Sequence, residues 1–146
     1  MLRERPITEM TESEVWETVR AHTRGRLVVV VDGEAEIFPV DYQATGDQVT
    51  FLTSPGTKLR ALQANPAVVF EIDGADDLAQ SAWSVVVRGT ATHVRDDGAL
   101  AAATVNGLAT SLDFPKYEVV VITPTTASGR RFRLDSAHRD RIDDHP

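Results

Sequence analysis

The sequence contains no cysteine, so disulfide bridges, thiolate catalysis and cysteine-ligated zinc are excluded. Any redox chemistry must therefore come from a cofactor that the protein binds. Hydrophobic residues make up 42% and charged residues 25% of the chain, which are the proportions of a globular protein rather than a disordered one. Its 146 residues are enough for one domain with its own core and too few for two ordinary domains.

Long apolar runs are absent as well. No run approaches the roughly 20 residues needed to cross a bilayer, and the segment Met1–Pro6 lacks the apolar centre of a signal peptide. The formal net charge is -7, and the arginines are spread along the chain instead of forming the basic stripe that binds nucleic acid. We therefore expect a soluble, cytoplasmic protein without a membrane or nucleic-acid partner.

Several motifs of well-known catalytic sites are also missing. There is no Gly-x-Gly-x-x-Gly dinucleotide motif and no P-loop, and no serine stands in a Gly-x-Ser-x-Gly elbow. The 4 histidines lack the short spacings that bind metals, so we expect no metal site. No side chain stands out as a general acid or base.

The first part of the chain predicts a helix followed by a hairpin. The segment Thr11–Glu14 has the spacing of a capping box, and the helix after it would turn Trp16 inward. Residues 26–31 form a valine-rich run that predicts a strand, and Asp32-Gly33 is the strongest two-residue signal for a hairpin. The partner strand is expected at 35–42, where its proline indicates an edge, a bulge or a closely approaching ligand.

The rest of the chain predicts further strands joined mostly by short turns. We expect them at 48–53, 67–73, 83–94, 117–123 and, returning along the sheet after Pro124 ends the strand before it, 127–134. Short helices are expected at 58–64 and 98–105, and loops at 74–82 and 107–115. This pattern of six or seven strands with two or three short helices predicts a mainly β fold, an antiparallel barrel with α additions.

Two of the predicted strands are apolar on both faces. The valines at 28–31 and 85–87 leave no polar face for solvent. Such strands must be covered on both sides, and in a small barrel the outer cover is a helix or another subunit. We therefore predict a homodimer.

The stretch Thr50–Leu62 is the best candidate for a binding site, because it predicts a strand end, a polar turn and a helix start. Hydroxyls and one ammonium lie there beside the N–H groups that a helix N-terminus leaves unpaired, an arrangement that suits a phosphate. These groups belong to Thr53, Ser54, Thr57 and Lys58. The alternative is an ordinary turn in which Thr57 caps the helix and Lys58 is solvated.

Two other groups of residues have both a functional and a structural interpretation. Arginines at strand ends, in Arg24–Arg26 and Arg130-Arg131, suit a bidentate grip on phosphate or carboxylate, or are simply surface charge. Phe38, next to a proline, and Trp83 suit the two sides of a planar ring, or they pack in the core.

Taken together, several blocks resemble the pyridoxamine 5′-phosphate oxidase-like family, in particular its short, largely actinobacterial branch. The resemblance covers roughly residues 12 to 134, and it depends on the order and spacing of the blocks. The blocks are Gly25–Leu27, Phe38–Tyr42, Phe51–Leu59, Trp83–Gly89 and Gly129–Phe132.

The resemblance implies an FMN-binding split β-barrel that dimerises, with flavins at the subunit interface. It assigns the FMN phosphate to the polar turn and its basic residue, that is to Thr53, Ser54, Thr57 and Lys58. It places the flavin ring beside the preceding strand, at Pro39, Val40 and Asp41. It also implies that a strand start reaches the cofactor from the other subunit, here Trp83 and Ser84.

Two departures separate this chain from the pyridoxamine phosphate oxidases proper. Those enzymes have a second basic residue where this chain has Leu59, and they carry an Arg-x-His substrate grip that Arg131-Phe132-Arg133 does not reproduce. We therefore expect a substrate other than pyridoxamine 5′-phosphate.

The resulting expectation is an N-terminal extension at 1–11, an FMN-binding domain at 12–134 and a solvated tail at 135–146. The leading hypothesis is an FMN-dependent oxidoreductase that passes electrons or hydride to a small organic acceptor. One alternative is a deazaflavin-dependent reductase with the same fold. Another is a non-catalytic module that binds or senses flavin or haem.

Overall fold

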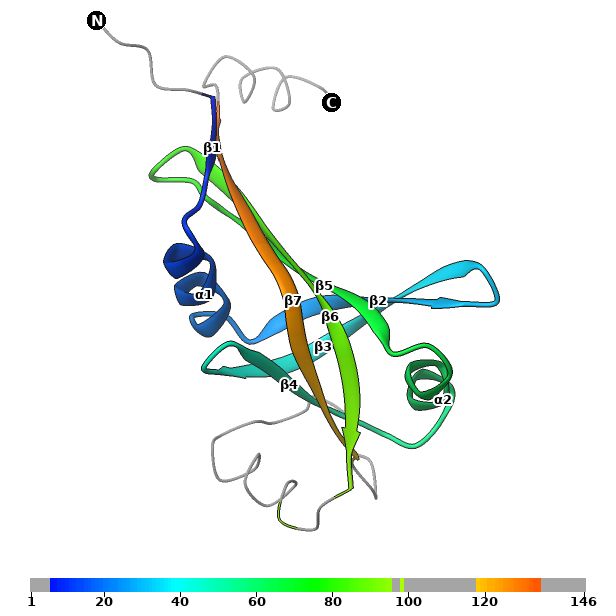
Figure 1. Ribbon diagram of the computed structural model, residues 1–146. Coiled ribbons are helices and arrows are strands. Elements are labelled where there is room, and N and C mark those ends of the chain that lie inside the picture. Colours follow the sequence, from blue (N-terminus) through cyan, green and yellow to red (C-terminus); the bar gives the residue numbers. More distant parts are fainter. Residues whose placement is uncertain (1–5, 96–97, 99–117, 135–146) are drawn as a thin grey trace, which may run out of the picture.

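The computed structural model describes residues 6–95, 98 and 118–134. Its elements are β1 (Ile7–Glu9), α1 (Glu12–Arg20), β2 (Arg24–Val31), β3 (Glu34–Thr45), β4 (Gln48–Thr53), α2 (Thr57–Ala64), β5 (Ala67–Asp76), β6 (Ser81–Val94) and β7 (Glu118–Arg133). All strand pairs are antiparallel. The strand order is β1-β7-β4-β3-β2-β5-β6, and an additional pairing of β6 with β7 closes the barrel (Figure 1).

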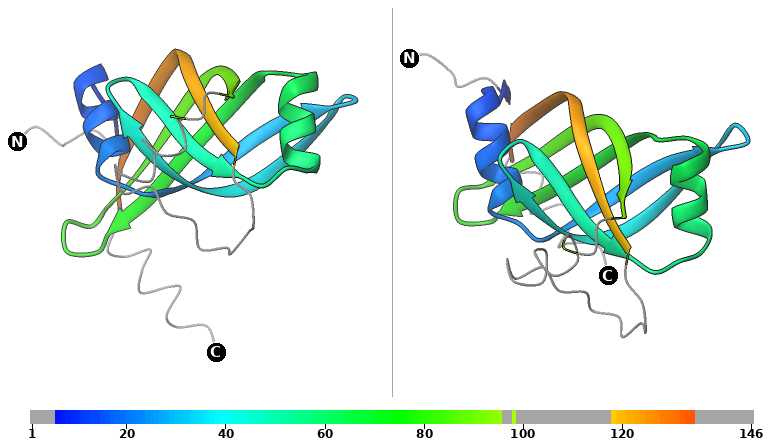
Figure 2. Two further views of the ribbon diagram at one scale, coloured as in Figure 1. Left: turned by 90° about the horizontal axis from the view of Figure 1, so that it is seen from below. Right: turned by 60° about the horizontal axis from the view of Figure 1, so that its bottom comes forward.

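This architecture confirms the predicted antiparallel barrel with short helices. The two helices described, α1 and α2, lie on opposite sides of the barrel (Figure 2). Among the described residues, no helix is long and apolar enough to cross a membrane. The helix expected at 98–105, the loop at 107–115 and the tail lie outside the described residues, apart from Gly98.

Strand β7 is where the sequence-based expectation was wrong. Pro124 does not end a strand: β7 runs unbroken from Glu118 to Arg133 and pairs with β6 along most of its length. On the opposite edge β4 pairs only as far as Ile122, and β1 begins pairing only at Arg130. A strand tolerates proline at an unpaired edge or a bulge. Both conditions hold at Pro124. One edge of β7 is unpaired there, and the register with β6 shifts beside it, opposite Arg88/Gly89.

The segment 74–82 is mostly strand and not a loop. Strand β5 continues to Asp76 and β6 starts at Ser81, so only four residues form the turn. The ends of β5 and β6 project from the barrel, and the turn between them is exposed. This segment therefore lacks the apolar residues by which a strand is predicted from sequence. Gly74 belongs here because an added Cβ would lie 2.6 Å from the ring of Trp83.

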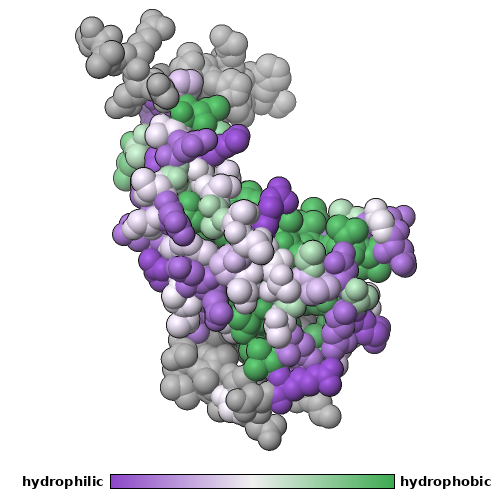
Figure 3. Space-filling model, in the orientation of Figure 1, coloured by the Kyte–Doolittle hydropathy of each residue, from purple (hydrophilic) through white to green (hydrophobic). Residues whose placement is uncertain are grey.

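The outer side of β2 is only partly covered. The inward side chains Leu27 and Val29 are fully buried, whereas the outward Val30 is 40% exposed. On β3, Ile37, the cross-strand partner of Val28, is 64% exposed. In the space-filling view, hydrophobic surface extends over the region of β5 and β2 toward the β2–β3 hairpin (Figure 3). Helix α1 and helix α2 therefore leave part of this apolar face open.

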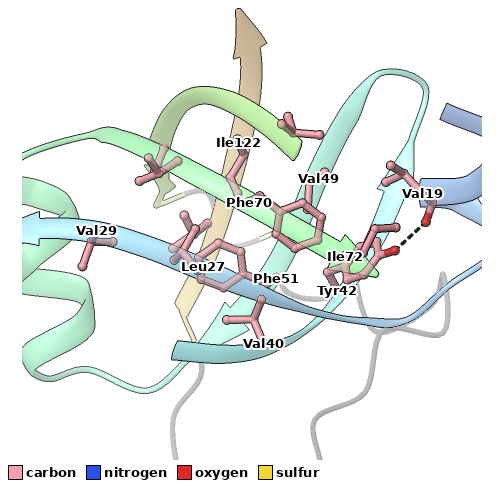
Figure 4. Packing of buried hydrophobic residues seen from close by; sticks show 14 of the residues in the cluster. Val19, Leu27, Val29, Val40, Tyr42, Val49, Phe51, Phe70, Ile72 and Ile122 are labelled. Carbon is pink, nitrogen blue, oxygen red and sulfur yellow. Dashed lines mark hydrogen bonds between the residues drawn. The ribbon is translucent and has the colours of Figure 1, made fainter. Parts of the chain in front are cut away.

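The core fills the barrel and continues under α1 (Figure 4). Helix α1 starts at Thr11 with the predicted capping box, and Trp16 is buried as expected. The Tyr42 hydroxyl donates a 2.6 Å hydrogen bond to the Val19 carbonyl, which ties β3 to the end of the helix. The ring of Tyr42 packs edge-on against Phe70 at 4.8 Å.

Candidate functional site

Helix α2 begins without a capping side chain. Its N-cap is Gly56, with φ 156 and ψ -153, a conformation that only glycine adopts freely. Thr57 is the first helical residue and is exposed, so the predicted alternative in which Thr57 caps the helix is wrong. The other helix, α1, has a complete capping box at Thr11 and Glu14. The N–H groups at the start of α2 therefore remain available to a ligand in a way that those of α1 do not.

The two residues before the turn are held by the end of β4. Thr53 is only 6% exposed, and its hydroxyl donates to the Ser54 carbonyl at 3.3 Å. Its Cα partner on β7 is Glu118. The structure thus brings Thr53, Ser54 and Thr57 to one turn, as the sequence predicted.

Lys58 turns from this helix toward β3. Its Nζ lies 5.2 Å from the centroid of the Phe38 ring, a cation–π contact. Burial lowers the pKa of the Lys58 ammonium, since the charged form loses part of its hydration. The first turn of α2 and the segment next to Pro39 are therefore neighbours within one chain.

The predicted ring-binding segment presents two side chains to the outside of the barrel. Pro39 is exposed and Asp41 half-buried on the outer face, whereas Val40 points inward and is 5% exposed. Nε of Arg24 donates a 3.1 Å hydrogen bond to Oδ1 of Asp41, and the two side chains form an ion pair. Arg24 therefore binds a carboxylate of its own chain.

A charge cluster lies on the same outer face, across β2 and β5. Nη1 of Arg26 lies 2.7 Å from Glu71 and 2.9 Å from Asp73. The bond to Glu71 raises the pKa of Arg26, and burial raises the pKa of Glu71. The cross-strand register puts Pro39, Arg26 and Glu71 side by side. The sequence analysis did not single out Glu71 or Asp73. Their spacing of two residues in the otherwise apolar first part of β5 was the feature that could have indicated a shared face of the sheet.

Trp83 and Ser84 lie at the other end of β6 from α2. The ring of Trp83 packs over Gly74 and lies 4.7 Å from that of His22. Near the opposite end of β6, His93 contacts α2, with its Nδ1 3.4 Å from Nε2 of Gln63. Ten residues of strand span up to about 33 Å. One chain therefore does not bring Trp83 and Ser84 to Lys58.

His93 is a further residue that sequence reasoning did not connect to the site. Its Nε2 lies 2.8 Å from Oε2 of Glu118, and its side chain is only 13% exposed. The histidine is isolated in the sequence, and only the register of β6 with β7 reveals its partner. Among the described residues, no group of three or more His, Cys, Asp or Glu side chains could hold a metal.

A cavity of about 720 Å³ opens beside the C-terminal end of β7. Residues of β1, the β5–β6 turn and β7 line it, including Leu78, Arg131 and Arg133. None of the predicted cofactor residues lines this cavity. Arg131 pairs with Glu14 at 3.3 Å, so it also has a carboxylate partner in its own chain.

Comparison with known proteins gives one family. The family model described as "Pyridoxamine 5'-phosphate oxidase" matches residues 11–131. No curated protein matches the chain.

Several solved structures are similar over nearly the whole chain. A Corynebacterium glutamicum protein, named only provisionally as a pyridoxamine 5′-phosphate oxidase, is 32% identical with a TM-score of 0.80, covering 92% of this chain and 99% of its own. The FAD binding protein from Mycobacterium smegmatis is 36% identical with a TM-score of 0.72, covering 87% and 99%. A Corynebacterium diphtheriae protein of unknown function is 35% identical with a TM-score of 0.74, covering 88% and 99%.

Proposed function

The chain belongs to the pyridoxamine 5′-phosphate oxidase family, and on this premise we propose that it binds a flavin, with FMN as the first candidate. The observation that carries the proposal is the contrast between the two helices. Helix α1 is closed by its capping box, whereas α2 starts at a glycine with a half-buried ammonium beside it. A phosphate would accept hydrogen bonds from these N–H groups and neutralise the charge of the Lys58 ammonium.

The phosphate grip would use the turn between β4 and α2. Hydroxyls of Ser54 and Thr57 would donate to phosphate oxygens, together with backbone N–H groups of the first helical turn. The Thr53 hydroxyl would join them by giving up its 3.3 Å hydrogen bond to the Ser54 carbonyl. Lys58 would supply the charge. The desolvation that lowers its pKa supports this role, because a bound anion would restore the interactions that the ammonium loses on burial.

The flavin ring would lie beside Pro39, Val40 and Asp41. The contact between Lys58 and Phe38 supports this arrangement, since it joins the proposed phosphate grip to the residue before Pro39. Trp83 and Ser84 would contact the same cofactor from a second subunit, because within one chain they lie at the far end of β6.

We also propose that the chain forms a homodimer through the outer face of β2, β3 and β5. This face carries an exposed apolar area that includes Val30 and Ile37, and across it Ile37, Val28 and Val69 are cross-strand neighbours, with Val28 and Val69 half-buried. Burying apolar surface of this kind contributes about 25 cal/mol per Å². A second copy is the partner that would also bring Trp83 and Ser84 to the site.

A bound flavin would supply the two-electron chemistry that a cysteine-free chain lacks, which supports a role as an oxidoreductase acting on a small organic molecule. The substrate would differ from pyridoxamine 5′-phosphate, because Leu59 and Arg133 replace the basic residue and the histidine of those enzymes. FAD is the second candidate cofactor, since a relative at 36% identity is named as an FAD-binding protein. FMN and FAD share the ring, the ribityl chain and the first phosphate.

Flavin titrations test the proposal. The purified protein is titrated separately with FMN, FAD, deazaflavin and riboflavin, and binding is followed by flavin absorbance and fluorescence. We expect FMN or FAD to bind and riboflavin, which lacks phosphate, to bind more weakly. Absence of flavin binding at high flavin concentration would overturn the proposal. Preferential binding of deazaflavin would mean that deazaflavin, and not FMN or FAD, is the cofactor.

A further inference from the structure

His93 connects three elements through side-chain contacts. It stands near the end of β6, with Glu118 of β7 at 2.8 Å on one ring nitrogen and Gln63 of α2 at 3.4 Å on the other. The side chains of His93 and Glu118 are 13% and 34% exposed. The shorter contact is therefore partly shielded from water, which strengthens a hydrogen bond to a carboxylate.

The three groups are matched as donors and acceptors. With the proton of a neutral imidazole on Nε2, His93 donates to the Glu118 carboxylate. Nδ1 is then an acceptor, and the Gln63 amide nitrogen donates to it. The hydrogen bonds thus run in one direction, from α2 through His93 to β7.

Both ends of this network lead to the proposed phosphate site. Glu118 is the Cα partner of Thr53, the last residue of β4 before the turn. Gln63 lies in the last turn of α2, whose first turn carries Thr57 and Lys58. Because α2 has only 8 residues, or about 12 Å of length, a change of tilt at one end moves the other.

We propose that His93 is a positioning residue that sets the orientation of α2, and with it the placement of the phosphate-binding groups at Thr57 and Lys58. The proposal rests on the proposed function, because it assigns His93 a role at that same site. His93 itself does not touch the ligand. It acts through Gln63 on the helix and through Glu118 on the strand that pairs with Thr53.

The test compares the affinities of FMN and riboflavin, which differ only by the phosphate. His93→Ala is expected to weaken FMN binding by about tenfold, the loss expected when one charge-assisted contact to the phosphate is displaced. Riboflavin binding should change little. The ratio of the two affinities therefore separates a displaced phosphate site from a general loss of stability, which would weaken both ligands alike.

Two further variants keep the test informative if His93→Ala does not fold. His93→Gln retains an amide that can donate to Glu118 and should restore much of the FMN preference. Gln63→Ala removes the helix end of the network at an exposed position and should reduce that preference in part. Thr125→Ala is the matched control, because its hydroxyl makes a comparable contact from β7 to the Arg88 carbonyl on β6.

The outcomes separate this inference from the proposed function. If the wild-type protein prefers FMN and folded His93→Ala or Gln63→Ala keeps the same ratio, the role of His93 is overturned while the flavin site stands. If the wild type binds no flavin, or does not distinguish FMN from riboflavin, the phosphate site at α2 itself is wrong and the role of His93 is overturned with it. An equal loss of preference in Thr125→Ala would also overturn it.

Discussion

The Lys58 ammonium lies 5.2 Å from the centroid of the Phe38 ring, so the first turn of α2 meets the strand that leads into Pro39. These segments are separated in the sequence by the whole of β4. The phosphate and ring positions that the family resemblance implies are therefore adjacent in a single chain. The tryptophan end of β6 is distant from both, which is why the proposed site needs a second subunit.

Replacing Lys58 by alanine should weaken FMN binding by about 1.5–3 kcal/mol, the worth of a charge-assisted contact. Riboflavin binding should be unaffected, because it has no phosphate to lose. Isothermal titration with both ligands measures the difference. Arg60→Ala is the control, since it removes an exposed charge from the same helix. If both substitutions have equal effects, Lys58 does not contact the phosphate.

Local sequence signals predicted much of the fold. Asp32 and Gly33 form the expected tight turn with φ 51 and 81, and the strand at 48–53 has the predicted bounds. Such features depend on neighbours in the chain, which a sequence shows directly. Strand β1 was missed because its three residues are all exposed and carry no burial pattern.

The errors arose where distant segments override a local rule. A proline normally ends a strand, but here β4 has already left that edge of β7, and a bulge opposite Arg88/Gly89 leaves Thr125 of β7 without a register partner. An added Cβ at Gly89 would lie 2.3 Å from the Thr123 carbonyl oxygen, so the close approach itself requires glycine. The candidate site shows the same limit: the strand end, turn and helix start at 50–62 were predictable, whereas the His93–Glu118 contact depends on strand register.

A charge on the open apolar face should disrupt the proposed dimer. Ile37→Glu places a carboxylate where the wild type is apolar and 64% exposed, so a buried interface there would have to desolvate it. We expect the variant to be a monomer and to lose flavin affinity. Sedimentation velocity measures the oligomeric state. Leu78→Glu is the control, because this 98% exposed leucine lies on the β5–β6 turn. A dimer that survives Ile37→Glu would move the interface elsewhere.

Gly56→Ala should destabilise the turn before α2. With φ 156 and ψ -153 the residue occupies a region that costs other amino acids about 1–3 kcal/mol. An added Cβ would meet no atom within 4 Å, so the effect is backbone strain and not a clash. Chemical denaturation measures the loss of stability, and FMN titration should show weaker binding in the folded protein. Unchanged values of both would show that the turn adopts another conformation at no cost.

Tyr42 should make stability depend on alkaline pH. Burial raises the pKa of its phenol above the ordinary value of 10.0, and the protonated hydroxyl donates to the Val19 carbonyl. Above pH 10.0 the unfolded chain releases this proton while the folded chain retains it, so the stabilisation is full below that pH and is lost as the pH rises. The slope approaches about 1.4 kcal/mol per pH unit for one proton.

Tyr42→Phe isolates this contribution. At neutral pH the variant should be less stable by about 1 kcal/mol, because the hydrogen bond to Val19 is lost. Phenylalanine does not titrate, so the gap between the two proteins should narrow when urea unfolding is repeated at about pH 11. The second tyrosine of the sequence is present in both proteins and cancels in the comparison. A gap that stays constant with pH would mean that Tyr42 titrates alike in the folded and unfolded chains.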